Sequence, residues 1–164
     1  YNSLPWKFTA GTPNILGTIL SAQAIRLLID FAINPRKRRY FLTNDKLNPA
    51  DIKTAMENIK AHEQALIGEA LKLLGEIPSL SIYGPKDPIK RTSLVAFTCD
   101  NKSPFKIAES LSGLGIESRA GCHCATLAHH YYELDPPASC RLSFYIYNDL
   151  NDVRKACATV KKCI

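Results

Sequence analysis

Apolar residues recur at helical spacing in two long segments of the N-terminal half. Spacings of three and four residues place such side chains on one face of an amphipathic helix. We therefore predict one helix over about 13–31, started by Thr12 and Pro13, and a second over about 48–74, ended by Gly75. The predicted buried positions are Ile15, Leu16, Ile19, Ala22, Ile25 and Ile29 in the first helix, and Ile52, Met56, Ile59, Leu66, Ala70 and Leu74 in the second.

After Pro78 the pattern changes to short alternating stretches, which are typical of strands. The sequence predicts strands at 80–83, 93–99, 116–119 and 141–147, a helix from Ser103 to 113–115, and a last helix from Leu150, capped by Asp149 or Asn148. The fold class is therefore α+β, a small and mainly antiparallel sheet packed with helices. The predicted inward residues are Ile107, Ala108 and Leu111, and in the last helix Val153, Cys157 and Val160.

Composition and charge exclude several classes of protein. With 164 residues, 46% apolar and 22% charged, the chain is an ordinary globular protein able to bury a core. The apolar stretch 15–33 contains Arg26 and Asp30, so we expect no membrane span and no membrane partner. Nucleic acid is an unlikely partner, because no recognisable binding module surrounds the basic run 36–39.

The six cysteines show no regular disulfide framework, which favours reduced thiols and a cytoplasmic location. The chain starts at Tyr1, and its only methionine is Met56, so we expect a piece of a longer protein without a signal peptide.

Residues 119–125 contain the highest density of chemically reactive side chains in the sequence. They lead into the loop 120–139, for which no helix or strand is predicted. The segment holds two thiols, an imidazole and a guanidinium. A cationic neighbour such as Arg119 or protonated His123 would favour a thiolate, so Cys124 or Cys122 is a candidate reactive thiol. A buried structural cysteine is the ordinary alternative. Metal binding is another, although the C-x-C spacing is unlike that of structural zinc sites.

Thr12 offers a second, weaker candidate site. A hydroxyl beside free amides at the start of a helix can bind phosphate, but from the pattern alone an ordinary helix cap is the favoured interpretation.

Three stretches resemble the class V aminotransferase group of pyridoxal-phosphate enzymes, and within it the cysteine desulfurases and selenocysteine lyases. They are 5–14 (PWKFTAGTPN), 119–125 (RAGCHCA), and 139–143 (SCRLS) followed by Tyr147 and Asn148. Both their order and their spacing agree with that family. The resemblance implies the C-terminal small domain of a fold-type I enzyme.

The resemblance also implies roles for single residues. Cys124 would be the nucleophile that takes sulfur as a persulfide, while Arg141 would pair with the carboxylate of the amino acid. Arg119 and His123 would line the substrate site. Members of the family often have His where Cys122 stands, so Cys122 could share, replace or resolve the persulfide.

For the cofactor, the resemblance implies that Gly11 and Thr12 contact the phosphate of pyridoxal 5'-phosphate bound to the partner subunit of a homodimer. The lysine that holds the cofactor in this family lies upstream, in a large domain absent from this sequence. The expected organisation is a lead-in loop and interdomain helix over 1–33, a connector of unassigned role over 34–53, and the small domain over 54–164.

We therefore predict that the chain is the C-terminal domain of a cysteine desulfurase and is inactive alone. The full-length enzyme would convert L-cysteine to L-alanine and pass the sulfur to an acceptor protein, as in iron–sulfur cluster assembly. Two alternatives stay open. One is a class V aminotransferase, lyase or epimerase whose cysteine is not catalytic. The other is a small thiol-based sulfur-carrier or metal-binding module.

Overall fold

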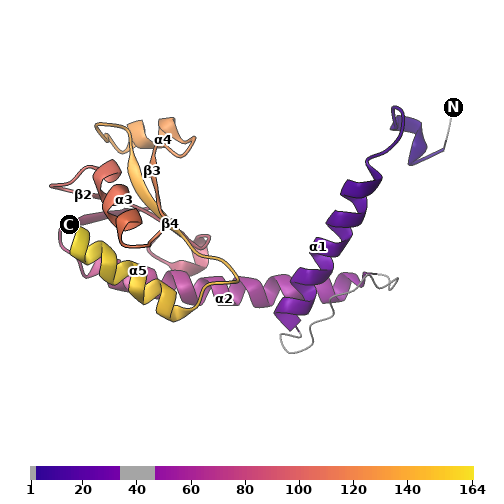
Figure 1. The fold of residues 1–164 in the computed structure, drawn as a ribbon, viewed down its shortest axis with the longest axis horizontal. Coiled ribbons are helices and arrows are strands. Elements are labelled where there is room, and N and C mark those ends of the chain that lie inside the picture. Colours follow the sequence, from indigo (N-terminus) through magenta and orange to yellow (C-terminus); the bar gives the residue numbers. More distant parts are fainter. Residues whose placement is uncertain (1–2, 34–46) are drawn as a thin grey trace. The chain divides into compact units, whose positions relative to one another are not determined.

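The computed structural model describes residues 3–33 and 47–164, which form two compact units, Tyr1–Ile59 and Lys60–Ile164 (Figure 1). Each unit is described by itself. The basic run 36–39 and most of the predicted connector 34–53 lie outside the described residues, so the segment boundaries expected from the sequence stay a prediction.

The first unit contains a 3-10 helix (Trp6–Phe8), helix α1 (Ile15–Ile33) and the start of helix α2 (Pro49–Gly75). Helix α1 begins two residues later than predicted, because Asn14 supplies the cap: its Oδ1 accepts a hydrogen bond of 2.8 Å from the amide of Gly17. The predicted capping role of Thr12 is therefore wrong. Near the other end of α1, the side chain of Asn58 donates to the carbonyl of Ala32 at 3.1 Å.

Helix α1 buries none of its residues in the structure. By length and mean hydropathy (1.6 over Ile15–Ile33) it is the one helix of the described chain that could cross a membrane, although Arg26 and Asp30 lie within it. Its exposed apolar side chains include Leu16, Leu20 and Leu27. Exposed apolar surface of this extent marks a region that another part of a protein, or a membrane, covers.

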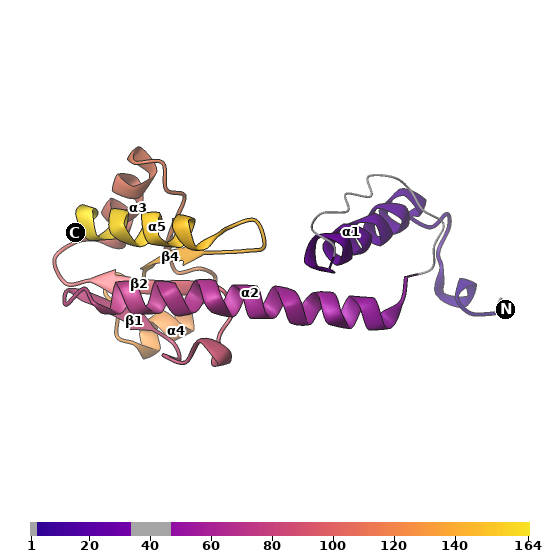
Figure 2. The ribbon, with the colours of Figure 1, turned by 90° about the horizontal axis from the view of Figure 1, so that it is seen from below.

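The second unit is built on a four-stranded antiparallel sheet, with strand order β1-β2-β4-β3. The strands are β1 (Leu80–Tyr83), β2 (Leu94–Cys99), β3 (Arg119–Gly121) and β4 (Ser139–Ser143), and the helices are α3 (Pro104–Gly113), α4 (Thr126–Tyr131) and α5 (Leu150–Cys163). Figures 1 and 2 show α5 lying beside the C-terminal part of α2. The predicted α+β class and antiparallel sheet are confirmed.

One face of the sheet carries the hydrophobic core. Val95 and Phe97 of β2 and Cys140 and Leu142 of β4 alternate with residues that face the other way, as strand geometry requires. They join one buried cluster with residues of α2, α3 and α5, which include the predicted Leu66, Ala70, Leu74, Ile107, Leu111, Val153, Cys157 and Val160. The helical periodicity therefore located most of the core correctly.

Helix α2 differs most clearly from the prediction at Met56, and the predicted Ile52 is only half-buried. Met56 is 43% exposed, whereas Ala55 and Ile59 are buried. Residues 55 and 59 are four apart, so they share a face, while Met56 is rotated by about 100° from Ala55. Side-chain size favoured methionine in the sequence pattern, but the position on the helix decides burial.

Strand β4 was misplaced by the prediction, which had it over 141–147. It spans Ser139–Ser143, and the chain then turns, with the side chain of Asn148 accepting from the amide of Tyr145 at 3.0 Å. Phe144 is still buried, so the apolar alternation continues past the paired strand. Strand β3 likewise begins at Arg119, where the prediction ended it, because its register is set by pairing with β4. The loop expected over 120–139 contains α4.

Helix α5 begins as predicted. Asp149 accepts hydrogen bonds from the amides of Asn151 and Asp152, and Asp152 accepts from the amide of Asp149, which makes a capping box.

We expect Leu66→Ala to lower the free energy of unfolding by about 2–5 kcal/mol, because it removes a side chain that is 1% exposed and leaves a cavity in the core. Leu114→Ala is the matched control: Leu114 is 55% exposed, and its change should stay within about 0.5 kcal/mol. Urea unfolding followed by circular dichroism measures both. Equal losses in the two variants would contradict the assigned core.

Candidate active site

The site is built on the pairing of β3 with β4. Arg119 lies opposite Arg141, and Gly121 lies opposite Ser139. Because neighbouring residues of a strand point to opposite faces, Ser139 and Arg141 face away from the core that Cys140 enters. Figure 1 shows α4 beside the ends of these two strands. The strand pair therefore places two arginines and the cysteine loop next to each other.

The loop after β3 is a strained turn. The amide of Ala125 donates to the carbonyl of Cys122 at 2.8 Å, and the two residues between them, His123 (φ 51°) and Cys124 (φ 58°), both have left-handed backbones. Two positive φ angles inside such a bond are the pattern of a type I′ turn. A left-handed backbone costs a residue other than glycine roughly 1–2 kcal/mol. Such strain persists only where surrounding contacts hold it.

Ser139 provides part of the contacts that maintain this strained turn. Its carbonyl accepts a 3.0 Å hydrogen bond from His123 Nε2, and its hydroxyl lies 2.9 Å from His129 Nε2. His129 Nδ1 in turn donates to the carbonyl of Ala125 at 2.9 Å, so the hydroxyl of Ser139 donates to the remaining ring nitrogen. Ser139 is 1% exposed and His129 is 7% exposed. The turn is thus tied to β4 through two histidines.

The sequence did not reveal this network. Ser139 lies in one of the stretches that carry the family resemblance, but the sequence pattern predicts no role for it or for His129 in the loop. No local signal marks either role, because both depend on which residue of β4 lies opposite Gly121.

His123 is held in its neutral form. Burial lowers the pKa of His123 from its ordinary value, and the positive charges of Arg141 and Arg119 lower it further, against the bond to the carbonyl of Ser139, which raises it. These surroundings therefore act against the protonated His123 that was expected to stabilise the thiolate. Its Nδ1 is buried and has no hydrogen-bond partner among the described residues.

The two thiols of the loop differ in their surroundings. The hydroxyl of Thr126 and the amides of Cys124 and Ala125 donate hydrogen bonds to the sulfur of Cys122, and these bonds, with that of Thr126 first, lower the pKa of Cys122. Cys122 is half-buried, whereas Cys124 is exposed at the tip of the turn. Hydrogen bonds, and not the cationic neighbours expected from the sequence, therefore favour the Cys122 thiolate.

The two arginines carry uncompensated positive charge. Within residues 3–33 and 47–164, neither Arg119 nor Arg141 forms an ion pair with a carboxylate. Arg141 is half-buried, and its Nε is buried without a hydrogen-bond partner in that same part of the chain. A guanidinium in this state is suited to a carboxylate, which it can bind through two parallel hydrogen bonds.

A pocket of about 220 Å³ lies on this face of the sheet. His123, Ser139 and Arg141 are among its lining residues, and its lining surface is almost entirely apolar. Its other walls come from Tyr83, Leu94, Ala96, Ala125, Ala128, His129, Tyr132 and Leu134. The pocket therefore places apolar walls beside His123 and Arg141, two of the three side chains predicted to bind substrate, while Arg119 and the two loop thiols do not line it.

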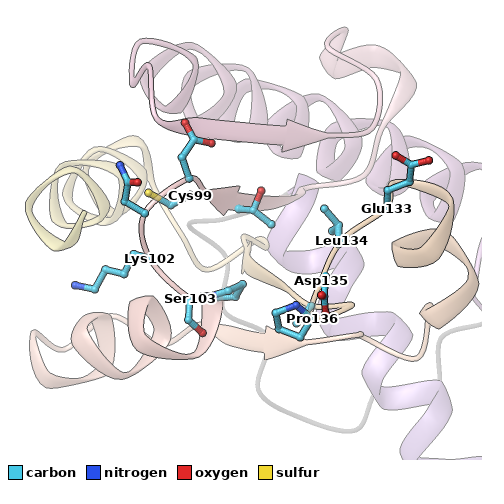
Figure 3. Close-up of a pocket in the computed structure, with 12 residues that line it drawn as sticks. Cys99, Lys102, Ser103, Glu133, Leu134, Asp135 and Pro136 are labelled. Carbon is cyan, nitrogen blue, oxygen red and sulfur yellow. The ribbon is translucent and has the colours of Figure 1, made fainter.

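A second pocket, of about 430 Å³, is lined by residues of the β2–α3 and α4–β4 connections, including Cys99, Lys102, Glu133 and Asp135 (Figure 3). The amine of Lys102 is bound to the carbonyl of Cys163. Its lining includes none of the residues predicted to react or to bind substrate, whereas the first pocket is lined by His123 and Arg141.

The remaining predicted residues, Gly11 and Thr12, lie in the first unit, before α1, and both are exposed. The cluster around the cysteine loop forms without them. Gly11 has a φ of 76°, and a Cβ built there would meet no atom within 4 Å. The described part of the chain contains no group of three or more His, Cys, Asp or Glu side chains that could hold a metal ion.

Fold and site together define a class: a small α+β domain that presents an exposed thiol beside unpaired arginines. The family model of the class V aminotransferases matches residues 50–155. The chain belongs to this family, which confirms the resemblance seen in its motifs. The family depends on pyridoxal phosphate.

Particular relatives sharpen the comparison. The chain is 34% identical to a probable cysteine desulfurase of Halalkalibacterium halodurans over 93% of this chain and 31% of the relative, and 34% identical to a cysteine desulfurase of Haloferax volcanii over 94% and 30%. It also matches the apo structure of cysteine desulfurase from Thermococcus onnurineus NA1, with a TM-score of 0.73 and 25% identity over 96% of this chain and 33% of that one. The chain therefore spans about a third of the length of these proteins.

We expect Thr126→Val to raise the pKa of Cys122 toward its ordinary value, because the hydroxyl that donates to its sulfur is lost. The measurement is the rate of alkylation against pH in a Cys124→Ser background, where Cys122 is the loop thiol that reacts. Since the thiolate is the reactive form, the half-maximal rate should move to higher pH in the valine variant. Thr126→Ser retains a hydroxyl and should keep the original profile. A valine profile that matches the parent's would refute the assigned hydrogen bond.

Ser139→Ala should lower the free energy of unfolding by about 1–3 kcal/mol, because the buried Nε2 of His129 loses its partner while the backbone bond to His123 remains. Ser143→Ala, on the exposed end of the same strand, is the control and should change stability by at most about 0.5 kcal/mol. Chemical denaturation compares the two. A neutral Ser139→Ala would mean that the hydroxyl does not support the loop.

Proposed function

We propose that this chain is the C-terminal part of a pyridoxal-phosphate-dependent cysteine desulfurase, which converts L-cysteine to L-alanine and takes up the sulfur as a persulfide on Cys124. The observation that carries the proposal is the exposed thiol of Cys124 at a strained turn, next to strands that bear two unpaired arginines. The similarity to proteins named cysteine desulfurases over nearly the whole chain supports it.

In this proposal the arginines bind and orient the substrate. Arg141 takes the carboxylate of the amino acid, because its guanidinium is half-buried and unpaired, and Arg119 adds positive charge from the neighbouring strand. His123 is neutral and fixed by its bond to Ser139, so its free Nδ1 can accept a proton. A group in that state can take the proton of a thiol before the thiol attacks.

Cys124 then acts as the nucleophile. Its thiolate attacks the sulfur of the bound cysteine, and a sulfur–sulfur bond forms as the carbon–sulfur bond breaks. The electron pair of the broken bond stays with the carbon skeleton, which takes up a proton and leaves as alanine. The exposed position of Cys124 would then allow a sulfur-acceptor protein to reach the persulfide, as iron–sulfur cluster assembly requires.

Pyridoxal phosphate, when bound, supplies the electron sink that lets the bonds around the amino acid's α-carbon break. The described residues fit one edge of it. Gly11, with a left-handed backbone and open space around it, and Thr12, with its hydroxyl, can approach a phosphate group across a homodimer. The lysine and the ring pocket of the family belong to the part of the protein beyond this chain, so the chain alone should be inactive.

The exposed apolar face of α1 fits the same proposal. Sequence similarity to cysteine desulfurases extends over 93–94% of this chain, which includes most or all of α1. We infer that α1 packs against the rest of the full-length homodimeric protein and does not enter a membrane. The apolar face of α1 is then covered, in the full-length protein, by the two thirds of the sequence that lie outside this chain.

In the full-length protein, Cys124→Ala should reduce alanine formation from cysteine by roughly 100-fold or more, since the group that accepts sulfur is lost. Cys99→Ala is the matched control, because Cys99 lines the other pocket and should leave turnover unchanged. Alanine is quantified over time with pyridoxal phosphate present. If the Cys124 variant keeps its turnover, the chain belongs instead to an aminotransferase, lyase or epimerase in which this thiol is a bystander.

A further inference from the structure

We propose that Cys122 resolves the persulfide of Cys124: the two residues form a disulfide within the loop, and the sulfur taken from the substrate is released as hydrosulfide. The inference rests on the proposed function, because it begins from the Cys124 persulfide. It goes further by assigning Cys122 a separate chemical role and by naming the product that leaves the site.

The turn brings the two thiols within reach of each other. Cys122 is the first residue of the turn closed by its carbonyl and the amide of Ala125, and Cys124 is the third. Consecutive Cα atoms are 3.8 Å apart, so two Cα atoms separated by one residue lie at most about 7.6 Å apart. The left-handed φ of His123 bends the chain between the two cysteines and shortens this distance toward the range of about 4.4–6.8 Å that disulfides span.

The surroundings of the two sulfurs assign their roles. Cys124 is exposed, as a thiol that meets substrate must be. Cys122 is half-buried and receives hydrogen bonds from Thr126 and from three backbone amides, its own included, which favour its thiolate. A thiolate attacks a sulfur–sulfur bond by in-line displacement. The thiol prepared for attack is therefore the neighbour of the thiol that carries the sulfur.

The other cysteines do not compete for this step. Cys140 and Cys157 are buried in the core, and burial raises the pKa of each thiol, that of Cys157 to about 12. Cys163 is buried as well, and Cys99 lines the pocket that does not include the loop.

The step balances without an added oxidant. The Cys122 thiolate attacks the inner sulfur of Cys124–S–SH, the new bond joins the two cysteine sulfurs, and the outer sulfur leaves as HS⁻ with the electron pair of the broken bond. The two-electron oxidation of the cysteine pair is matched by reduction of the transferred sulfur to sulfide. A small thiol or a dithiol protein then reduces the disulfide for another turnover.

The test uses the full-length protein with pyridoxal phosphate and one equivalent of cysteine, in the absence of other thiols. Intact mass and free sulfide are measured together. The parent protein should become lighter by two hydrogen atoms and release about one sulfide per site. Chymotryptic cleavage after Tyr131 or Tyr132 separates the loop from Cys140, so the disulfide can be assigned to Cys122 and Cys124.

Cys122→Ser should instead become heavier by one sulfur atom and release no sulfide, because the persulfide has no resolving partner. Cys99→Ser is the matched control and should behave as the parent does. If the parent also stays heavier by one sulfur atom, the resolving role of Cys122 is refuted while the proposed desulfurase stands. If neither protein produces alanine, the proposed function fails and this inference fails with it.

Discussion

The buried side chain of Ser139 determines how this domain can hold a reactive loop. It lies beneath two residues, His123 and Cys124, whose left-handed backbones are unfavourable for residues with a Cβ. Its backbone carbonyl accepts a hydrogen bond from His123, its hydroxyl donates one to His129, and His129 donates in turn to the carbonyl of Ala125. The second and the fourth residue of the turn are thereby attached to β4. Because the same strand carries Arg141, the thiols and the guanidinium share one rigid support.

The electrostatics of the site follow from this support. His123 is half-buried, with contacts to Ser139 of β4 and His129 of α4, and that burial, with the positive charges of Arg141 and Arg119, favours its neutral form. A neutral imidazole can take a proton, whereas an imidazolium could only add to the positive field. The field itself comes from Arg119 and Arg141, which lie opposite each other in the strand pair. The positive charge of the site therefore comes from the two arginines and not from His123.

The sequence predicted those features that depend on local periodicity. Apolar spacing predicted helices α2, α3 and α5, strand β1 and most of the core. Asp149 was recognisable as a helix cap. Features that depend on strand pairing were not predicted. The prediction misplaced β3 and β4, contained no helix at the position of α4, and gave no role in the loop to Ser139, His129 or Thr126. The cysteine loop was found because its residue types are unusual. Its electrostatics were misjudged, since a sequence does not show which donors reach a sulfur.

The geometry of the turn explains why its two cysteines are not equivalent. In a turn closed by a bond from the fourth residue to the first, the amides of the third and fourth residues lie on the side of the first residue. A thiol at the first position therefore receives hydrogen bonds, as Cys122 does from Cys124 and Ala125. A thiol at the third position lies at the outer end of the turn and meets solvent, as Cys124 does. The spacing Cys-x-Cys, read as weak metal-binding geometry, thus suits a pair in which one sulfur is stabilised as a thiolate and the other is presented to a substrate.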